Sequence, residues 1–378
     1  EVLGHDAGGC SARVLCAVGG VLTTAEPNET AALHALWYAL CHSEAHTELL
    51  LDAIDQWIPQ VTCEHLGILD VGSSEGGNAI HGMCQIVRHL RTRTDRPIWS
   101  FFCDLPSNDF NHLFLKLFEK QAAEPFGHDV FPGVIAGNGF RRLVPPRTLH
   151  IATSFNALGY LETKPDTPLP NYLTPFPPSP DAPRDGVFVT EEQSEPYRQQ
   201  AAQDMANFYK ARAEELVTGG KLLVQTWGRH EKISTGYSSI DVMSDALLDM
   251  IDAGRLPRKA YEDLRWPAWM RNLEELLEPI KSDPALAAAF RIDKAESYER
   301  PTPFNAEFEK TGDRAAWATQ FTSYMRAWAE PVIRSAMPAE NQNALIDEMY
   351  QRVEQRLREQ PERYPYHFAC VAALLTRL

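Results

Sequence analysis

Residues 66–90 combine a buried-strand pattern, a glycine-rich turn and a helix pattern, and this order constrains the fold most. An apolar run over 66–71 ends abruptly at Gly72, and two further glycines follow at Gly76 and Gly77. From Ala79 on, apolar residues recur at helical spacing. A doubly wound α/β sheet opens its ligand cleft with such a strand, turn and helix. The pattern alone fits an ordinary strand-to-helix connection equally well.

A second apolar run supports the prediction of a ligand cleft. Residues 98–103 are predicted to form the next strand, and Asp104 follows directly. An acid at the tip of the strand after a glycine turn commonly accepts hydrogen bonds from a ribose diol. The alternative is an aspartate that merely caps a loop. Together, Gly72 and Asp104 favour a site for a nucleoside-containing cofactor.

Composition excludes several classes of protein. The chain has 378 residues, 44% of them hydrophobic, and a formal charge of -15. It can bury a large core, whereas its charge argues against nucleic acid or an anionic membrane as partner. No apolar run approaches a membrane span and no signal peptide is evident. Seven scattered cysteines without a CxxC pair, and no HExxH, predict reduced thiols, a cytoplasmic location and no metal site.

The remaining patterns alternate strands with helices and then become helical. Helices are expected from Pro27, over 44–58, over 113–118 and over 191–216, the last ended by Gly219 and Gly220. Strands are expected over 130–136, 149–153, 222–226 and 368–375. Eight prolines in 164–184 predict a long surface loop, either beside the substrate cleft or as an insertion. Residues 238–360 are mainly helical and rich in Trp and Met, which fit either a pocket lining or a plain core.

These elements predict an α/β fold: a Rossmann-like doubly wound mixed sheet with a mainly helical cap. We expect three regions. Residues 1–44 form an N-terminal arm and first helix that complete the active site. Residues 45–235 with 363–378 form the sheet domain, and residues 236–362 form the cap that contacts substrate.

Several motifs resemble those of the SABATH methyltransferases, the plant salicylate, benzoate, jasmonate and caffeine-pathway enzymes. Residues 70–78, D-V-G-S-S-E-G-G-N, resemble the family's D-L-G-C-S-S-G-P-N. Residues 104–111, D-L-P-S-N-D-F-N, resemble its D-L-P-G-N-D-F-N, which is the most specific match. Residues 149–161 and 200–229 resemble two further motifs, so the resemblance covers nearly the whole chain.

The resemblance implies methyl transfer from S-adenosyl-L-methionine, usually to a small-molecule carboxylic acid. It implies Ser73 and Asn78 at the methionine end, Asp104 on the ribose and Leu105 on the adenine. Asn138 replaces a family serine near the adenine, and Gly139 replaces a Phe, so one adenine contact is expected to be missing. The implied cofactor-binding set is Asp70, Gly72, Ser73, Asn78, Asp104, Leu105, Asn138 and Gly139.

The acceptor site departs from the family pattern. The family holds the substrate carboxylate with a Gln of the N-terminal arm, absent here, and a Trp, which is Tyr160 here. Tyr160 can still donate one hydrogen bond. The implied substrate-binding set is Tyr160, Asn156, Gly159, Ile240 and Phe368. Asn156, Gly159 and Ile240 are smaller than their family counterparts, which predicts a larger or more polar acceptor. Arg265 occupies a family magnesium position, so no metal is expected.

The chemistry needs no catalytic acid or base, only positioning, because a carboxylic acid is already ionised at pH 7. The resemblance also implies a homodimer. Three alternatives stay open: an N-methyltransferase of the same family, a methyltransferase-like protein that only binds, and a nicotinamide dehydrogenase. The last does not explain residues 104–111.

Overall fold

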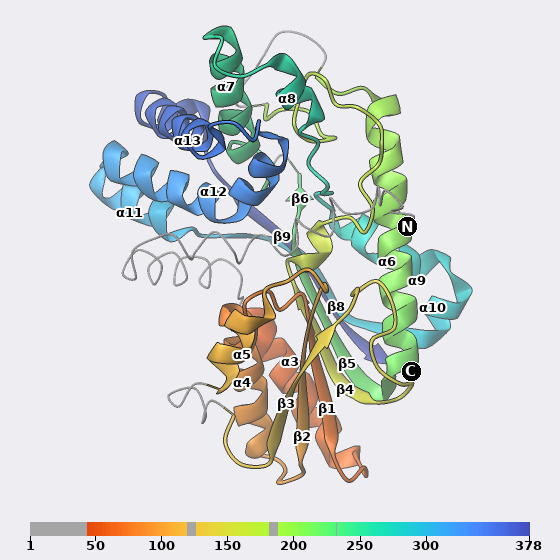
Figure 1. Ribbon diagram of the computed structural model, residues 1–378. Helices are drawn as coiled ribbons and strands as arrows, with labels where there is room; N and C mark the ends of the chain where they lie inside the picture. Colours follow the sequence, from red (N-terminus) through yellow and green to blue (C-terminus); the bar gives the residue numbers. More distant parts are fainter. Residues whose placement is uncertain (1–43, 119–125, 181–187, 232) are drawn as a thin grey trace, which may run out of the picture.

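A computed structural model describes residues 44–118, 126–180, 188–231 and 233–378. Seven strands form one mixed sheet with helices on both faces and a helical layer beyond one end (Figure 1). The expected fold class is therefore confirmed. In spatial order the strands are β3 (Val130–Ala136), β2 (Ile98–Asp104), β1 (Leu66–Val71), β4 (Leu149–Phe155), β5 (Leu216–Trp227), β9 (Phe368–Arg377) and β8 (Phe290–Arg300).

The direction of the strands places a cleft at the middle of the sheet. Strand β1 pairs in parallel with both β2 and β4, so the strand order reverses between β1 and β4. Ligands of such sheets bind outside the carboxyl ends of the strands at this reversal. All six residues of β1 are buried, as its continuous apolar run predicts for a strand covered on both faces. Strand β9 is antiparallel to both neighbours and makes the sheet mixed.

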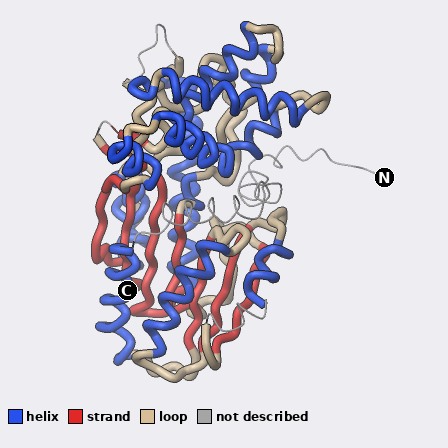
Figure 2. Tube along the Cα trace, turned by 90° about the vertical axis from the view of Figure 1, so that its left-hand side faces the viewer, coloured by secondary structure: helices blue, strands red, loops and turns tan. Residues whose placement is uncertain are grey.

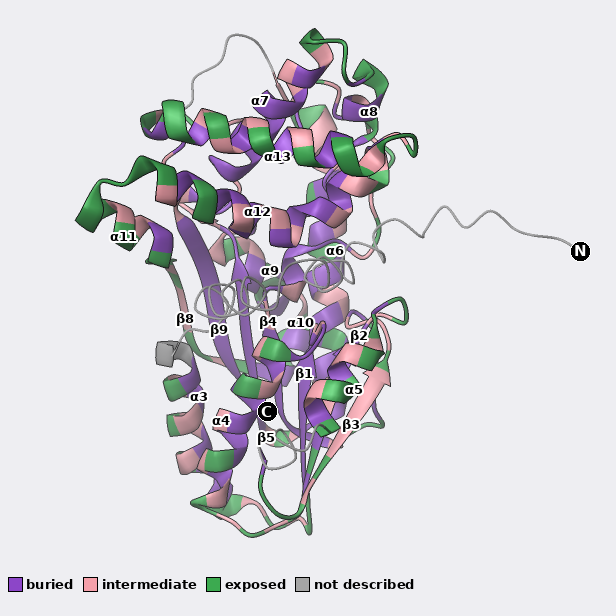
Figure 3. Ribbon diagram, turned by 60° about the vertical axis from the view of Figure 1, so that its left-hand side comes forward, coloured by how far each residue is buried: buried purple, intermediate pink, exposed green. Residues whose placement is uncertain are grey.

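Two groups of helices cover the sheet. One face carries α3 (Glu44–Trp57), α4 (Gly77–Arg91) and α5 (Phe110–Phe118), and the other carries α6 (Glu191–Glu215), α9 (Leu273–Ser282) and α10 (Pro284–Ala289). Each helix turns an apolar stripe inward. On α4 this stripe includes Met83, Val87 and Leu90, which pack with Leu50 and Ile54 of α3. The edge strand β3 is only half-buried (Figure 3).

The helical layer has its own apolar core. Its helices are α7 (Ser239–Asp252), α8 (Arg258–Asp263), α11 (Pro303–Thr311), α12 (Arg314–Ala336) and α13 (Gln342–Glu359). Figure 2 shows this layer beyond the ends of the strands. The short elements η2 (Ile58–Gln60), η3 (Ala157–Gly159), η4 (Pro361–Arg363), β6 (Arg229–His230) and β7 (Ile233–Ser234) lie in the connections. The core of the layer is largely aromatic, with Phe304 stacked on Phe321 at 5.1 Å between ring centres.

The predicted helix over 191–216 is confirmed as α6, but the prediction that Gly219 and Gly220 end it is wrong. The helix ends at Glu215, and both glycines lie inside β5, which starts earlier than expected. Gly219 has a φ of +83°, and a Cβ there would collide with the indole of Trp57. The glycines therefore serve an irregularity in the pairing of β4 with β5 and the close approach of α3.

The proline-rich segment is only partly a surface loop. Residues 164–180 contain no helix or strand, as predicted. However, Leu169, Tyr172 and Leu173 are buried, and the Tyr172 hydroxyl donates to Asp241 Oδ1 at 2.6 Å. The segment therefore packs into the helical layer, which its apolar residues allow and its prolines do not reveal.

Strand β8 is the element that the sequence did not indicate. It lies within residues 236–362, the range expected to form the cap, and pairs with β9 in the main sheet. Its alternation of charged and apolar residues suits an exposed edge strand. The division into domains stays a proposal. The expected N-terminal arm and the helix from Pro27 lie outside the described residues. Within the described part of the chain, no helix is long and apolar enough to cross a membrane.

A buried ion pair fixes the loop that follows β3. Arg212 and Glu215 of α6 are fully buried, with Nε and Oε2 2.6 Å apart. Arg212 also donates to the carbonyl oxygens of Gly139 (3.3 Å) and Arg141 (3.0 Å). Glu215 accepts from the backbone N–H groups of Leu143 and Val144. The pair thus holds residues 139–144 against the sheet.

Replacing Glu215 by leucine should lower the free energy of unfolding by about 3–5 kcal/mol, because the Arg212 guanidinium would stay buried without its counter-charge. Urea unfolding followed by circular dichroism measures this. The control is Glu214→Leu: Glu214 pairs with Arg142 at 3.0 Å on the surface, so its loss should cost only a small fraction of that. Equal losses for the two variants would contradict the role of the buried pair.

Candidate functional site

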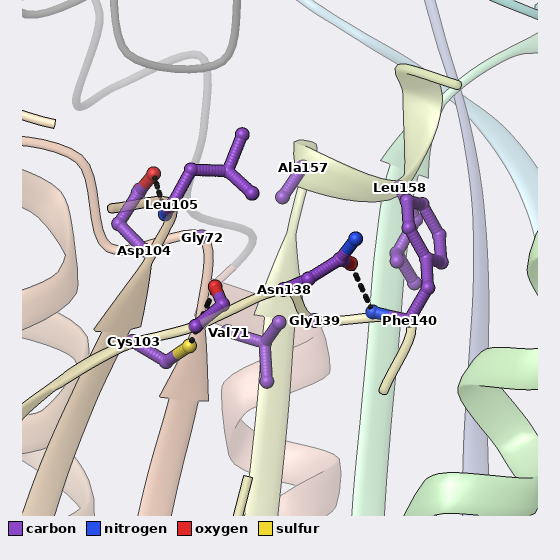
Figure 4. A pocket seen from close by; sticks show the side chains of 11 residues that line it. Val71, Gly72, Cys103, Asp104, Leu105, Asn138, Gly139, Phe140, Ala157 and Leu158 are labelled. Carbon is purple, nitrogen blue, oxygen red and sulfur yellow. Dashed lines mark hydrogen bonds between the residues drawn. The ribbon is translucent and has the colours of Figure 1, made fainter. Parts of the chain in front are cut away.

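A pocket lies at the carboxyl ends of the central strands, where the strand order reverses. It encloses about 360 Å³ of space free of protein atoms, counting the open solvent at its mouth. We call it the cofactor pocket. It is lined by Val71, Gly72, Cys103, Asp104, Leu105, Gly137, Asn138, Gly139, Phe140, Ala157 and Leu158 (Figure 4). Five of the eight predicted cofactor-binding residues are among them.

The glycine turn shapes one wall of this pocket. Gly72 has a φ of +90°, and a Cβ on it would collide with Ala157 of the turn after β4. The N–H groups of Gly72 and Ser73 both donate to the Cys103 carbonyl, at 2.8 and 2.9 Å. Helix α4 begins at Gly77, after Gly76 in a left-handed conformation. The turn therefore brings backbone to the pocket, where a larger residue would close it.

Asp70 and Ser73 hold the glycine turn through hydrogen bonds and do not line the pocket. Ser73 donates to Asp70 Oδ2 at 2.9 Å, and Thr153 of β4 donates to Asp70 Oδ1 at 2.8 Å. Burial raises the pKa of Asp70 to about 6, against these hydrogen bonds. Asn78 is half-buried in the first turn of α4 and is also outside the lining. For these three residues, cofactor contact stays a prediction.

Asp104 stands at the end of β2 with its carboxylate held by backbone. Ser74 N–H donates to Oδ2 at 2.6 Å and Leu105 N–H to Oδ1 at 2.7 Å. Burial raises the pKa of Asp104 to about 6, although both N–H groups favour the ionised form. Each carboxylate oxygen has two lone pairs, so each can accept one more hydrogen bond. This is the capacity that a ribose diol requires.

Asn108 is a supporting residue that sequence reasoning did not single out. Its Nδ2 donates to the Ser74 carbonyl at 2.8 Å, so residues 104–111 brace the glycine turn. The sequence signal that could have identified Asn108 was its place in the motif over residues 104–111.

Residues 137–140 form the opposite wall. Asn138 accepts from Phe140 N–H at 2.9 Å (Figure 4). It also donates to Glu162 Oε1 at 2.9 Å. A Cβ on Gly139 would press on Val71. The aromatic side chain of the wall comes from Phe140, which sequence reasoning missed because it considered Gly139 alone. Phe140 therefore supplies an aromatic side chain to this wall, and the loss of an adenine contact at Gly139 stays a prediction.

A second hollow lies between the sheet and the helical layer and encloses about 370 Å³ free of protein atoms, counting the open solvent at its mouth. We call it the acceptor hollow. It is lined by Tyr160, Trp227, Thr235, Trp266, Met270, Tyr324, Trp328 and Phe368. The turn at η3 joins the two sites, since Ala157 and Leu158 line the cofactor pocket and Tyr160 lines the acceptor hollow. A ligand in one is thus close to a ligand in the other.

The predicted acceptor residues divide into two groups. Tyr160 and Phe368 line the hollow. Ile240 is buried in the core of the helical layer and outside the lining. A Cβ on Gly159 would collide with the Trp227 indole, which fills that space. Asn156 shapes the turn: it has a φ of +64°, and its Oδ1 accepts from Trp227 N–H at 3.0 Å.

Trp227 therefore takes the volume at Gly159, and the larger or more polar acceptor expected from these three small residues stays a prediction. Sequence reasoning did not single out Trp227 and Tyr324, and it left the tryptophans of residues 238–360, Trp266 and Trp328 among them, open between pocket lining and core. The type of a side chain alone does not distinguish a pocket position from a core position.

The chain resembles known proteins over most of its length. Residues 40–377 match the family model described as SAM dependent carboxyl methyltransferase. Gibberellic acid methyltransferase 2 of Arabidopsis thaliana is 29% identical over 314 residues, 77% of this chain and 76% of the relative. Indole-3-acetate O-methyltransferase 1 of the same plant is 26% identical over 310 residues, 76% of each chain. A solved structure of loganic acid methyltransferase with SAH superposes with a TM-score of 0.70 at 19% identity, covering 100% of this chain and 98% of that one.

Replacing Asp104 by asparagine should weaken binding of S-adenosylhomocysteine at least about tenfold at pH 7.5, because a charge-assisted hydrogen bond contributes about 1.5–3 kcal/mol. Isothermal calorimetry measures the affinity. Asp109→Asn is the matched control: its half-exposed side chain caps the start of α5 and should leave affinity unchanged. Unchanged affinity in the Asp104 variant would remove this residue from the site.

The same affinity should fall as pH decreases through about 6. The pKa of Asp104 is raised to about 6 by burial, so the carboxylate becomes protonated below that pH and loses the charge that strengthens its bonds to hydroxyl groups. Calorimetry at pH 7.5, 6.5 and 5.5 should show this decline in the wild type and a flatter profile in Asp104→Asn. Identical profiles would assign the titration to another group.

Proposed function

The chain belongs to the family of SAM-dependent carboxyl methyltransferases, and from this premise we propose where and how it acts. It uses S-adenosyl-L-methionine to methylate small-molecule carboxylic acids. We propose that the cofactor binds in the cofactor pocket and the acid in the acceptor hollow. The observation that carries this is the turn over 157–160, whose residues line both sites.

The cofactor pocket fits an adenosyl group. Asp104 can accept from both ribose hydroxyls, and Leu105 and Phe140 offer apolar surface to a flat base. Gly72 and Gly139 keep the walls apart, because side chains there would strike Ala157 and Val71. When bound, S-adenosylmethionine supplies an electrophilic methyl group on a sulfonium.

The protein contributes alignment and a dry environment. The acid is ionised at neutral pH, so its oxygen attacks without prior proton removal. As the new O–C bond forms, the C–S bond breaks, and an ester and a neutral thioether result. Aromatic walls exclude water from the acceptor hollow, and Tyr160 offers a hydroxyl to the carboxylate. Too strong a grip on the carboxylate would oppose the reaction, so a few hydrogen bonds that orient it suffice.

A screen of carboxylic acids with methyl-labelled S-adenosylmethionine tests the proposal. The product should be a methyl ester that releases its label in mild base, which an N-methyl product would not do. Labelled product that resists base would redirect the proposal to N-methylation. The relatives' names give gibberellic acid, indole-3-acetate and jasmonic acid as starting members of the panel.

A homodimer and a cytoplasmic location belong to the same proposal. Trp99 and Phe131 are 44% and 45% exposed on the neighbouring strands β2 and β3, with ring centres 5.4 Å apart. A second copy could cover such a surface. Among the described residues Cys63, Cys84, Cys103 and Cys370 are free thiols, as in a reducing compartment. Light scattering during gel filtration tests the dimer.

Replacing Tyr160 by phenylalanine should lower kcat/KM for the acid by roughly 10- to 100-fold and leave S-adenosylhomocysteine affinity nearly unchanged, because the hydroxyl would bond to an anionic oxygen. Steady-state kinetics and calorimetry measure the two quantities. Tyr209→Phe is the control, since its hydroxyl donates to the Leu276 carbonyl at 3.1 Å within the core between α6 and α9. A Tyr160 variant with wild-type kcat/KM would refute the assignment.

A further inference from the structure

Trp328, which lines the acceptor hollow, carries a hydrogen-bond donor that the reaction at the carboxylate does not use. Trp328 of α12 lines the hollow, and its Nε1 atom is buried without a hydrogen-bond partner among the described residues. Two other indoles of the described chain do have partners. Trp317 Nε1 donates to Asn305 Oδ1 at 2.9 Å, and Trp269 Nε1 donates to Glu275 Oε2 at 3.2 Å.

An unpaired buried N–H is costly, and buried donors in folded proteins are rarely left without acceptors. The indole is also held in place by its neighbours. Its ring packs edge-on against Trp266 with centres 5.4 Å apart, and against Tyr324 at 6.2 Å. Phenylalanine or leucine would fill an apolar position here without this cost. The N–H therefore points to an acceptor that a ligand brings.

Trp328 stands on the wall of the hollow that the helical layer supplies. The sheet side of the hollow is formed by Tyr160 after β4, Trp227 at the end of β5 and Phe368 at the start of β9. Tyr160 lies two residues after Leu158, which lines the cofactor pocket. The carboxylate that receives the methyl group must lie on that side. Trp328, from α12, therefore lies near the end of the acid that is remote from its carboxylate.

We propose that Trp328 Nε1–H binds an oxygen remote from the carboxylate, and that the preferred substrates are largely apolar acids that carry such an oxygen. The inference rests on the proposed function, because it takes the hollow as the acid's site. An indole N–H can only donate, so a ketone, ether, ester or hydroxyl oxygen fits and an ammonium group does not. Trp227, Trp266 and Met270 require an apolar skeleton between the two ends. A site built around such a bond discriminates against the analogue that lacks the oxygen.

Matched acids that differ by one ketone oxygen test the proposal. Suitable pairs are cyclohexylacetate with 4-oxocyclohexylacetate, and 4-cyclohexylbenzoate with 4-(4-oxocyclohexyl)benzoate. For each pair, calorimetry on the protein saturated with S-adenosylhomocysteine gives affinity, and turnover with S-adenosylmethionine gives kcat/KM. In the wild type, the keto acid of at least one pair should be preferred about five- to tenfold in both measurements. Trp328→Phe keeps an aromatic ring but loses the N–H, and it should abolish the preference.

Trp317→Phe is the matched control, because it removes a paired indole N–H from the same helix outside the hollow and should retain the preference. The nitrogen–proton correlation spectrum of Trp328→Phe should lack one indole N–H resonance, which assigns that resonance to Trp328. In the wild type, the same resonance should shift when the keto acid binds. Methyl ester formation without any Trp328-dependent preference overturns this inference and leaves the proposed function intact. A Trp328-dependent binding preference without ester formation would support the contact at Trp328 and overturn the assignment of the hollow as the methyl-accepting site. Absence of both overturns both.

Discussion

Arg271 carries a fully buried guanidinium group where α6, the chain after β5 and the turn between the two ligand sites meet. Its Nη2 donates to the Ala201 carbonyl of α6 at 3.0 Å, and its Nη1 donates to the Leu158 carbonyl in the turn. Its own carbonyl accepts from Arg229 N–H at 2.9 Å. Burial lowers the pKa of Arg271 to about 10, and the nearby carboxylates of Asp204 and Glu275 limit the fall. The group therefore stays charged at neutral pH and fixes the backbone that both sites share.

Two buried arginines thus hold the parts of the sites that lack regular structure. Arg271 binds the turn over 157–160, and Arg212 with Glu215 binds the loop over 139–144. Loops cannot satisfy their own backbone groups as helices and strands do, and a buried guanidinium offers five donors in a rigid fork. Desolvating such charges is costly, so they stabilise the fold only while every partner is in place. These buried arginines preorganise the two ligand sites, because the walls of the sites keep their geometry before the ligands bind.

The extent to which the sequence predicts these sites follows from the range of the interactions involved. The glycine turn and Asp104 were predictable, because a strand end, a left-handed glycine and a capping acid are properties of a few consecutive residues. The packing of the Trp227 indole against Gly159 was not, because it depends on side-chain volume between the end of β5 and the turn at η3, which are far apart in the sequence. Likewise Gly219 looks like a helix stop along the sequence but serves contact with Trp57. Strand β8 was missed because an exposed edge strand has few apolar residues and a helical context surrounds it.

The aromatic character of the acceptor hollow follows from the charges of the reaction. A cationic sulfonium and an anionic carboxylate meet, and both products are neutral. Water solvates the separated charges better than the products, so a wet site would favour the starting state. Walls such as Trp227, Trp266 and Phe368 remove that solvation and leave the two ligands to neutralise one another. A strong cation in the hollow would compete with the sulfonium for the carboxylate, whereas neutral donors such as the Tyr160 hydroxyl can orient it. In this chain Arg271 is accordingly kept behind the turn, where it holds backbone rather than substrate.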